Sequence, residues 1–266
     1  MVHRRILRSL IPVAAIAITV WPTASRGQMA QPLLRASSLN PRVGQTIELL
    51  LNLPSRDAWP DANIGLLIVR VDGQQRSIPV QPKQGKESLD LKFDQAGYVM
   101  IAMSAGPAPA KGHSDSWQRT PYCCKLVLRV DSADAKASTE HFADEPGIVG
   151  KVGQKIEILP LINPATLRVG DDLPVRVYYE GGKIPGAAVQ AMFMSQIGPL
   201  RPANVISRTT DAVGTAWFPI SQKGRWIVRM EHQVEGVTYV AELVFDIALE
   251  RAEGINPDES NSGGKQ

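Results

Sequence analysis

The sequence predicts an all-β protein: two immunoglobulin-like β-sandwich modules in tandem after a signal peptide. Short segments in which apolar and polar residues alternate recur between turn residues, as in strands. No long segment of the 266 residues keeps a helical period. Two short motifs of the first half also return in the same order in the second half, which favours a repeated unit.

Residues 1–30 have the composition of a secretory signal peptide. Three arginines form a basic start, and an apolar run of about ten residues ends at Val20. This run is too short to cross a hydrocarbon core of roughly 30 Å as a helix. We therefore expect cleavage between Ser25 and Ala30 and a periplasmic mature chain without a membrane span; an uncleaved N-terminal anchor is the alternative.

Loss of the signal peptide changes the charge of the chain. The full sequence has 29 basic and 26 acidic residues, but residues 1–30 contain four arginines and no acidic residue. The mature chain then has 25 basic and 26 acidic residues, a net charge of −1. The sequence pI near 8.9 belongs to the precursor, so it does not indicate a nucleic-acid partner.

The first module, residues 31–131, is predicted to consist of short strands. Residues 43–53 alternate between two faces, as a half-buried strand does. Residues 64–71 are a near-continuous apolar run that ends in Asp72-Gly73, a specific hairpin signal. Further strands are predicted at residues 88–93, 98–103 and 122–130.

Residues 132–150, rich first in Ala, Ser and Asp and then in Pro and Gly, are predicted to be a linker. The second module, residues 151–250, is again predicted to consist of short strands joined by turns. Residues 173–179 alternate as a strand, and residues 180–183 turn the chain because their two glycines accept positive φ angles. The tail, residues 251–266, is too polar to fold and is predicted to be disordered.

The two halves share motifs at a nearly constant spacing. Residues 42–47 open the first module and are matched by residues 168–173 of the second. Residues 97–101 are matched by residues 224–228 at almost the same offset of about 126 positions. Two matches in the same order favour two copies of one sandwich unit with around seven strands each. Chance similarity among strands flanked by glycine is the alternative.

Cys123 and Cys124 are the only two cysteines, and they are adjacent in a predicted strand. Neighbouring strand residues point to opposite faces, so a disulfide between them requires a strained ring. One interpretation is a redox or soft-metal site, since thiolates favour copper(I) and zinc. The other places one cysteine in the core and one in a partly covered position.

His113 and His141 are further candidate metal ligands, in a loop and in the linker. Neither has the spacing of a known metal motif, so solvated loop residues are the alternative. Met192 and Met194 share a strand face, where a thioether pair could bind copper(I), although methionine more often fills a core. Three aromatic residues are predicted to fill the core of the second module: Trp217, Phe218 and Trp226.

Catalytic motifs are missing from the sequence. It contains no Gly-x-Ser-x-Gly elbow, no phosphate-binding loop and no spacing that suggests a catalytic triad. The carboxylates of Asp171, Asp172 and Asp211 fall in predicted turns, where such groups cap the backbone; a calcium site at the sandwich edge is the alternative for Asp211. We therefore expect a protein that is not an enzyme.

The second half carries a series of turn and core motifs. They are Asn163-Pro164, then Tyr179-Glu180-Gly181-Gly182-Lys183-Ile184-Pro185-Gly186-Ala187, then Thr210-Asp211-x-x-Gly214-x-Ala216-x-Phe218. In these motifs the chain resembles the domain-of-unknown-function family 4198, which includes periplasmic accessory proteins of nickel and cobalt uptake. The resemblance implies an accessory or binding protein that assists uptake of a transition metal, with an envelope transporter or receptor component as its partner.

The chain departs from this family near the mature N-terminus. Family members commonly carry a histidine there, whereas residues 28–34 contain none. A softer metal-ligand set is therefore the expectation, drawn from Cys123, Cys124, His113 and His141. Two alternative functions are a structural or protein-interaction module of the cell envelope and a thiol redox function at the adjacent cysteines.

Overall fold

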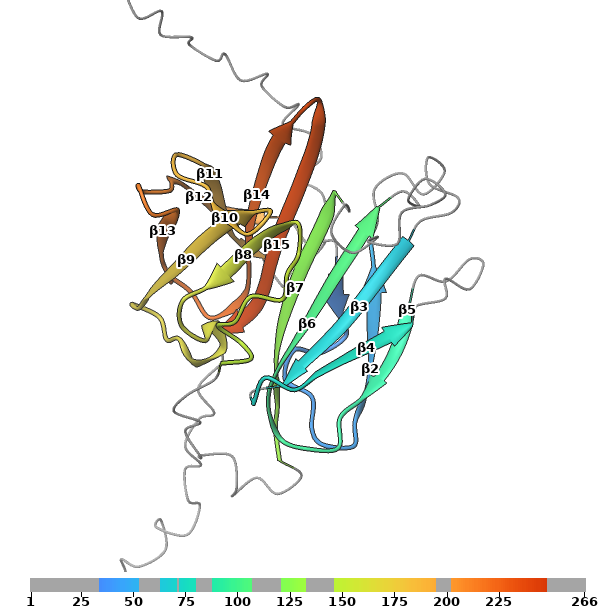
Figure 1. The fold of residues 1–266 in the computed structure, drawn as a ribbon. Coiled ribbons are helices and arrows are strands. Elements are labelled where there is room, and N and C mark those ends of the chain that lie inside the picture. The colour runs from blue at the N-terminus through green and yellow to red at the C-terminus, as the bar shows by residue number, and fades with distance from the viewer. Residues whose placement is uncertain are drawn as a thin grey trace, which may run out of the picture.

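The computed structural model describes residues 34–52, 63–70, 72–79, 88–106, 121–132, 146–194 and 202–247. In these residues the chain is almost entirely β-strand, so the predicted all-β sandwich is confirmed (Figure 1). The predicted signal peptide and tail lie outside the described residues, as do His113 and His141.

An eight-stranded sheet runs through the middle of the molecule in the order β12-β11-β14-β15-β7-β6-β3-β4 (Figure 1). The last strands of the two halves, β7 and β15, lie side by side and are parallel, whereas the other neighbours in this sheet are antiparallel. The bounds are β3 (Asn63–Arg70), β4 (Gln75–Pro79), β6 (Gly97–Gly106), β7 (Tyr122–Val130), β11 (Ala188–Met194), β12 (Pro202–Thr209), β14 (Gly224–Val234) and β15 (Val237–Ile247).

Two smaller sheets pack against this central sheet. The first is formed by β1 (Leu34–Ala36), β2 (Thr46–Leu51) and β5 (Ser88–Lys92). The second is formed by β8 (Ile156–Pro160), β9 (Asp172–Tyr179), β10 (Gly182–Lys183) and β13 (Thr215–Pro219). The 3-10 turn η4 (Pro164–Thr166) follows β8 and is capped by the side chain of Asn163, which accepts from the Ala165 amide.

The small sheets lie on opposite faces of the central sheet. Successive residues of β7 point to opposite sides, so Cys123 and Val127 enter the core beneath β8, β9 and β13. Cys124 and Leu126 enter the core beneath β1, β2 and β5. Strand β7 is therefore buried on both faces and belongs to both cores.

Both halves use the same strand order and the same turn before the second strand. The strands of each half follow one another outward from the central β7–β15 pair. Their order is β7-β6-β3-β4 in the first half and β15-β14-β11-β12 in the second. The Gly44 amide donates to the Phe93 carbonyl at 2.8 Å, and the Gly170 amide donates to the Ile220 carbonyl at 2.8 Å. Both glycines have positive φ angles, which explains why the motif keeps glycine there.

The central sheet continues from one half of the chain into the other. The boundaries of two separate modules, at residues 31–131 and 151–250, therefore stay a prediction. Part of the predicted linker is packed. Ile148 is fully buried in the second core, and a Cβ added at Gly147 would collide with the Arg70 carbonyl. Residues 133–145 lie outside the described residues.

The prediction that three aromatic residues fill the second core is wrong for Trp217. Phe218 and Trp226 are fully buried, whereas Trp217 is 55% exposed because it points outward from β13. Within the residues that the structure describes, no helix is long and apolar enough to cross a membrane.

Candidate functional site

Cys123 and Cys124 are buried in different cores and form no disulfide. The Cys123 sulfur lies 3.8 Å from the Ser104 hydroxyl, and the Cys124 thiol donates to the Lys125 carbonyl at 3.7 Å. Burial, assisted by the nearby Glu242 carboxylate, raises the pKa of the Cys124 thiol well above its ordinary value. The structure does not bring the two thiols together, and their role as metal ligands or as a redox pair stays a prediction.

The other two predicted metal ligands, His113 and His141, lie outside the described residues. Among the residues that the structure describes, no three His, Cys, Asp or Glu side chains are grouped as a metal site would require. Met192 and Met194, the thioether pair, are buried in the first core, so core filling is their observed role.

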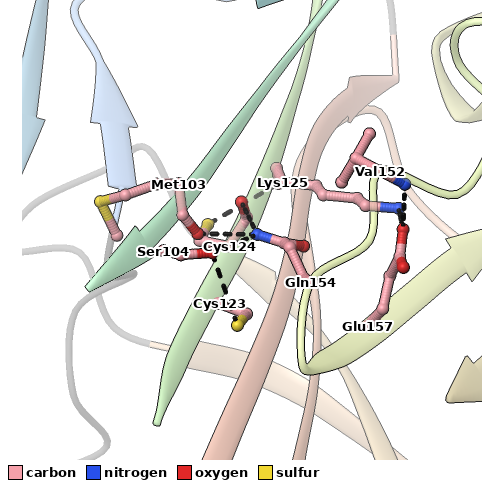
Figure 2. A network of polar contacts seen from close by, with 8 residues as sticks. All are labelled: Met103, Ser104, Cys123, Cys124, Lys125, Val152, Gln154 and Glu157. Atoms are coloured by element: carbon pink, nitrogen blue, oxygen red, sulfur yellow. Dashed lines mark hydrogen bonds and ion pairs between the residues drawn. The ribbon is translucent and has the colours of Figure 1, made fainter. Parts of the chain in front are cut away.

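A buried polar network joins the segment before β8 to β7 and β6 (Figure 2). The Lys125 ammonium lies 2.7 Å from the Glu157 carboxylate, with side chains only 1% and 3% exposed. Glu157 also accepts from the Val152 amide at 2.7 Å. The Gln154 amide group donates to the Met103 carbonyl at 2.7 Å. This network positions the second half against the first and leaves no side chain open to a ligand.

A second polar cluster lies between β8, β9 and the β14–β15 hairpin. The Tyr179 ring lies 5.1 Å from the His232 ring and 5.2 Å from the Tyr239 ring. The Lys155 ammonium lies 3.3 Å from the Glu180 carboxylate. Burial opposes the charge of Lys155, but hydrogen bonds with Tyr239, Glu180 and Tyr179 raise its pKa well above the ordinary value. The Lys155 ammonium also lies 4.8 Å from the centre of the Tyr239 ring and 5.5 Å from the centre of the Tyr179 ring, so this cluster is held together by contacts among its own members.

The outward side of the second small sheet carries an exposed aromatic residue. On β13, Ala216 and Phe218 point into the core, so Trp217 between them points to solvent. Trp217 lies directly opposite Pro174 of β9. The next outward residue of β9 is Arg176, whose Nε donates to the Thr215 hydroxyl at 3.1 Å.

Basic side chains continue along the same side. Tyr178 is the next outward residue of β9, and Lys183 of β10 pairs with it and so shares its face. The Lys151 ammonium lies 3.6 Å from the centre of the Tyr178 ring and donates to the Gly181 carbonyl at 3.2 Å. We call this surface the basic aromatic face; its accessible members are Lys151, Arg176, Lys183 and Trp217, and Tyr178 lies buried against Lys151.

Sequence reasoning missed this face, although a signal was present. In residues 215–219 the apolar residues Ala216 and Phe218 fall on one side of a period-two pattern, which puts Trp217 on the other. The Lys125–Glu157 pair had no comparable signal, because a lysine in an alternating strand normally faces solvent.

A family model described as Domain of unknown function (DUF4198) matches residues 65–234. No curated protein matches the sequence. The chain shares 13% identity with a protein from a structural study of promiscuous carbohydrate-binding modules of the β-sandwich superfamily, over 71% of this chain and 83% of that one, with a TM-score of 0.26.

Two further solved structures are similar at the same low level. A putative membrane anchored protein from Corynebacterium diphtheriae has 10% identity and a TM-score of 0.28, over 81% of this chain and 58% of that one. Trypsin-activated α-2-macroglobulin from Escherichia coli has 16% identity and a TM-score of 0.23, over 80% of this chain and 15% of that one. Similarity of this extent carries no inference about function. Since the family model runs from β3 to the end of β14, the chain belongs to the DUF4198 family.

Proposed function

We propose that the protein is an exported, non-enzymatic binding protein that serves an envelope system and holds its ligand on the basic aromatic face. The observation that carries the proposal is Trp217, which is 55% exposed on a regular strand. An indole ring is a large, rigid apolar surface with a single donor, and water solvates it poorly. A ligand that covers this ring would remove that unfavourable exposure.

The scaffold beneath Trp217 supports binding without prior rearrangement. Its strand neighbours Ala216 and Phe218 are buried, and β13 is paired with β9 along its whole length. Gly214, with a φ of 76°, lets the turn before β13 pack closely against β9 and β10. A backbone held in this way loses little conformational entropy when a ligand is bound, which favours affinity.

The residue types support binding more than catalysis. The basic aromatic face consists of cationic and aromatic side chains, which hold ligands by charge and contact. The strongest nucleophiles of the chain, Cys123 and Cys124, are buried in the two cores. The pKa of Cys124 is raised, so its thiolate, the reactive form, is disfavoured.

Co-sedimentation of the mature protein with washed envelope particles tests the proposal. We expect the wild type to be found in the pellet and Trp217→Ala to remain in the supernatant, with both variants folded by circular dichroism. Val205→Ala is the matched control, because Val205 is an apolar residue of β12 that is 40% exposed elsewhere on the second half. Equal sedimentation of the wild type and Trp217→Ala would rule out the face as the binding site.

The finer part of the proposal is that the system served is uptake of nickel or cobalt, as the family resemblance implies. It is tested by calorimetry of Ni²⁺ and Co²⁺ with the mature protein and with a His113→Ala/His141→Ala variant. We expect binding that the double variant loses. The absence of binding heat for the wild type would remove the metal role and leave the binding proposal standing.

A further inference from the structure

We propose that the ligand of the basic aromatic face is an acidic saccharide, a chain of sugar rings that bear carboxylates. This inference rests on the proposed function and adds the chemical class of the ligand. It is carried by the combination of one exposed aromatic side chain and several cations on the outward side of one paired sheet.

The outward residues of β9 arrange the face as a line. Pro174, Arg176 and Tyr178 are alternate residues of one strand, so neighbours along the line are roughly 7 Å apart. Trp217 lies beside the Pro174 end, and Lys183 lies beside the Tyr178 end. Pro174 and Tyr178 are themselves buried, so the accessible part of the face is formed by Trp217, Arg176, Lys183 and Lys151. These groups follow the roughly 14 Å from Pro174 to Tyr178, which suits a linear chain of linked rings rather than one compact molecule.

Trp217 supplies the contact for a sugar ring. The C–H groups on one side of a pyranose form an apolar surface that stacks on an indole plane, whose face carries partial negative charge. The cross-strand partner is proline, which has no polar side-chain group to compete for the ring. Arg176, held by the buried Thr215 hydroxyl, provides hydrogen-bond donors next to the indole for the hydroxyls of a sugar.

The cations select a ligand that carries negative charge. Arg176 is fixed through its Nε by Thr215, and within the described residues its guanidinium makes no other hydrogen bond or ion pair. The two Nη groups are thus available to a carboxylate in a bidentate arrangement. Lys151 and Lys183 are exposed at the other end of the line, so successive acidic groups would each meet a cation.

Acidic side chains of the same sheet do not cancel this charge. Asp172 is the outward carboxylate at the start of β9, four residues before Arg176. Glu157 faces outward next to Tyr178 in the register of β8 and β9, but it is buried in its ion pair with Lys125. Among the described residues of this face, the centre and the Lys183 end are therefore positive.

Other anionic ligands fit the face less well. Single-stranded nucleic acid binds through several stacked aromatic residues, whereas Trp217 is the one large aromatic side chain strongly exposed in the described part of the chain. An acidic peptide gains most from pairing with a sheet edge, and this face is the side of a sheet. A neutral saccharide would leave the cations of the face without partners.

Calorimetry with oligogalacturonate, a chain of carboxylated sugar rings, tests the inference on the mature protein. We expect binding at micromolar concentrations that weakens as salt is added, since exposed charges are screened. Trp217→Ala and the double variant Lys151→Gln/Lys183→Gln should each bind at least about tenfold more weakly, equivalent to about 1.4 kcal/mol. Arg76→Ala, which removes an exposed cation from β4 of the first half, is the control and should bind as the wild type does.

Further probes separate the possible outcomes. Neutral dextran oligomers, oligodeoxythymidylate and vesicles with anionic lipid headgroups should bind more weakly than oligogalacturonate, and tighter binding of any of them would overturn the ligand class. If Trp217→Ala loses envelope binding but oligogalacturonate does not bind the wild type, the saccharide inference fails and the binding proposal remains. If Trp217→Ala still binds envelope particles, both fail.

Discussion

Lys125 of β7 carries a cation into the interior of the molecule, where it meets Glu157 of β8. Within the part of the chain that the structure describes, its one charged contact of short range is Glu157, and both side chains are almost completely shielded from water. Burial lowers the pKa of Lys125, and the Glu157 carboxylate acts against this effect. Such a pair adds little net stability compared with an apolar pair, but losing one partner leaves an uncompensated buried charge.

Replacement of Glu157 by Gln should therefore lower the free energy of unfolding by about 3–5 kcal/mol, measured by urea denaturation. Glu231→Gln removes the exposed partner of Arg229 and should cost less than about 1 kcal/mol. The double variant Lys125→Met/Glu157→Leu should recover most of the loss. A small loss for Glu157→Gln would mean that water reaches Lys125 in the folded protein.

The two thiols should not react in the folded protein. Cys123 and Cys124 are at most 1% exposed, and the pKa of Cys124 is raised by burial. We expect no iodoacetamide adduct at neutral pH in native buffer and two adducts in urea, measured by mass spectrometry. Rapid native alkylation of either thiol would support the redox alternative.

His232 should make stability depend on pH. Burial lowers the pKa of its imidazole below the ordinary 6.5, so the folded form binds the proton more weakly than the unfolded form. As the pH falls below about 6.5, the unfolded chain takes up a proton first, and stability is lost. When the pH is lowered from about 7.5 to about 5, the Tm of the wild type should fall, and the Tm of His232→Gln should fall less. An equal fall in Tm for the two proteins would show that the imidazole titrates alike in the folded and the unfolded state.

At the scale of elements, short alternating strands are what the sequence predicts best. The pattern of residues 173–179 gives β9 and its buried face, because side-chain direction in a strand depends only on neighbouring residues. The turn at Gly44 and its equivalent at Gly170 are similarly local, since only the backbone angle of one residue is involved. Local patterns thus gave the strands and the repeated motifs.

The pairing of strands that are distant in the sequence could not be predicted from such local patterns. The parallel contact of β7 with β15 joins segments more than a hundred residues apart, and both strands are apolar on two faces. Neither segment contains a residue pattern that specifies the strand with which it pairs. The candidate site shows the same limit: alternation could place Trp217 outside, but its position beside Arg176 follows from the register of β13 on β9.

The entry into the second half depends on one glycine. The backbone of Gly147 lies against the Arg70 carbonyl at the end of β3, where a side chain has no room. Gly147→Ala should lower the free energy of unfolding by about 3 kcal/mol in urea denaturation, because backbone atoms must move apart. Gly182→Ala is the control, since its nearest contact, the Tyr179 carbonyl at 3.4 Å, is an ordinary one. Similar stability for both variants would show that the entry segment adapts.

At the scale of the whole molecule, the two halves should unfold together. Leu126 of β7 is paired with Val244 of β15, and both are buried in the same core. Scanning calorimetry of the mature protein should show one transition, and Leu126→Ala should lower its Tm at a cost of about 2–5 kcal/mol without splitting it. Two separate transitions would mean that the shared sheet does not couple the halves.

The repeated architecture also bears on how many ligands one chain is expected to bind. By the matched hydrogen bonds of Gly44 and Gly170, the position of Trp217 opposite Pro174 corresponds to Asp90 opposite Glu48 on the first small sheet. The first half therefore presents the same backbone surface with two carboxylates where the second has an indole and a proline. The outward side of the first small sheet also includes Lys92, opposite Thr46, and Arg35, opposite Leu50. It lacks the indole at the matched position, so we expect a stoichiometry of one acidic ligand per protein, measured by calorimetry with oligogalacturonate.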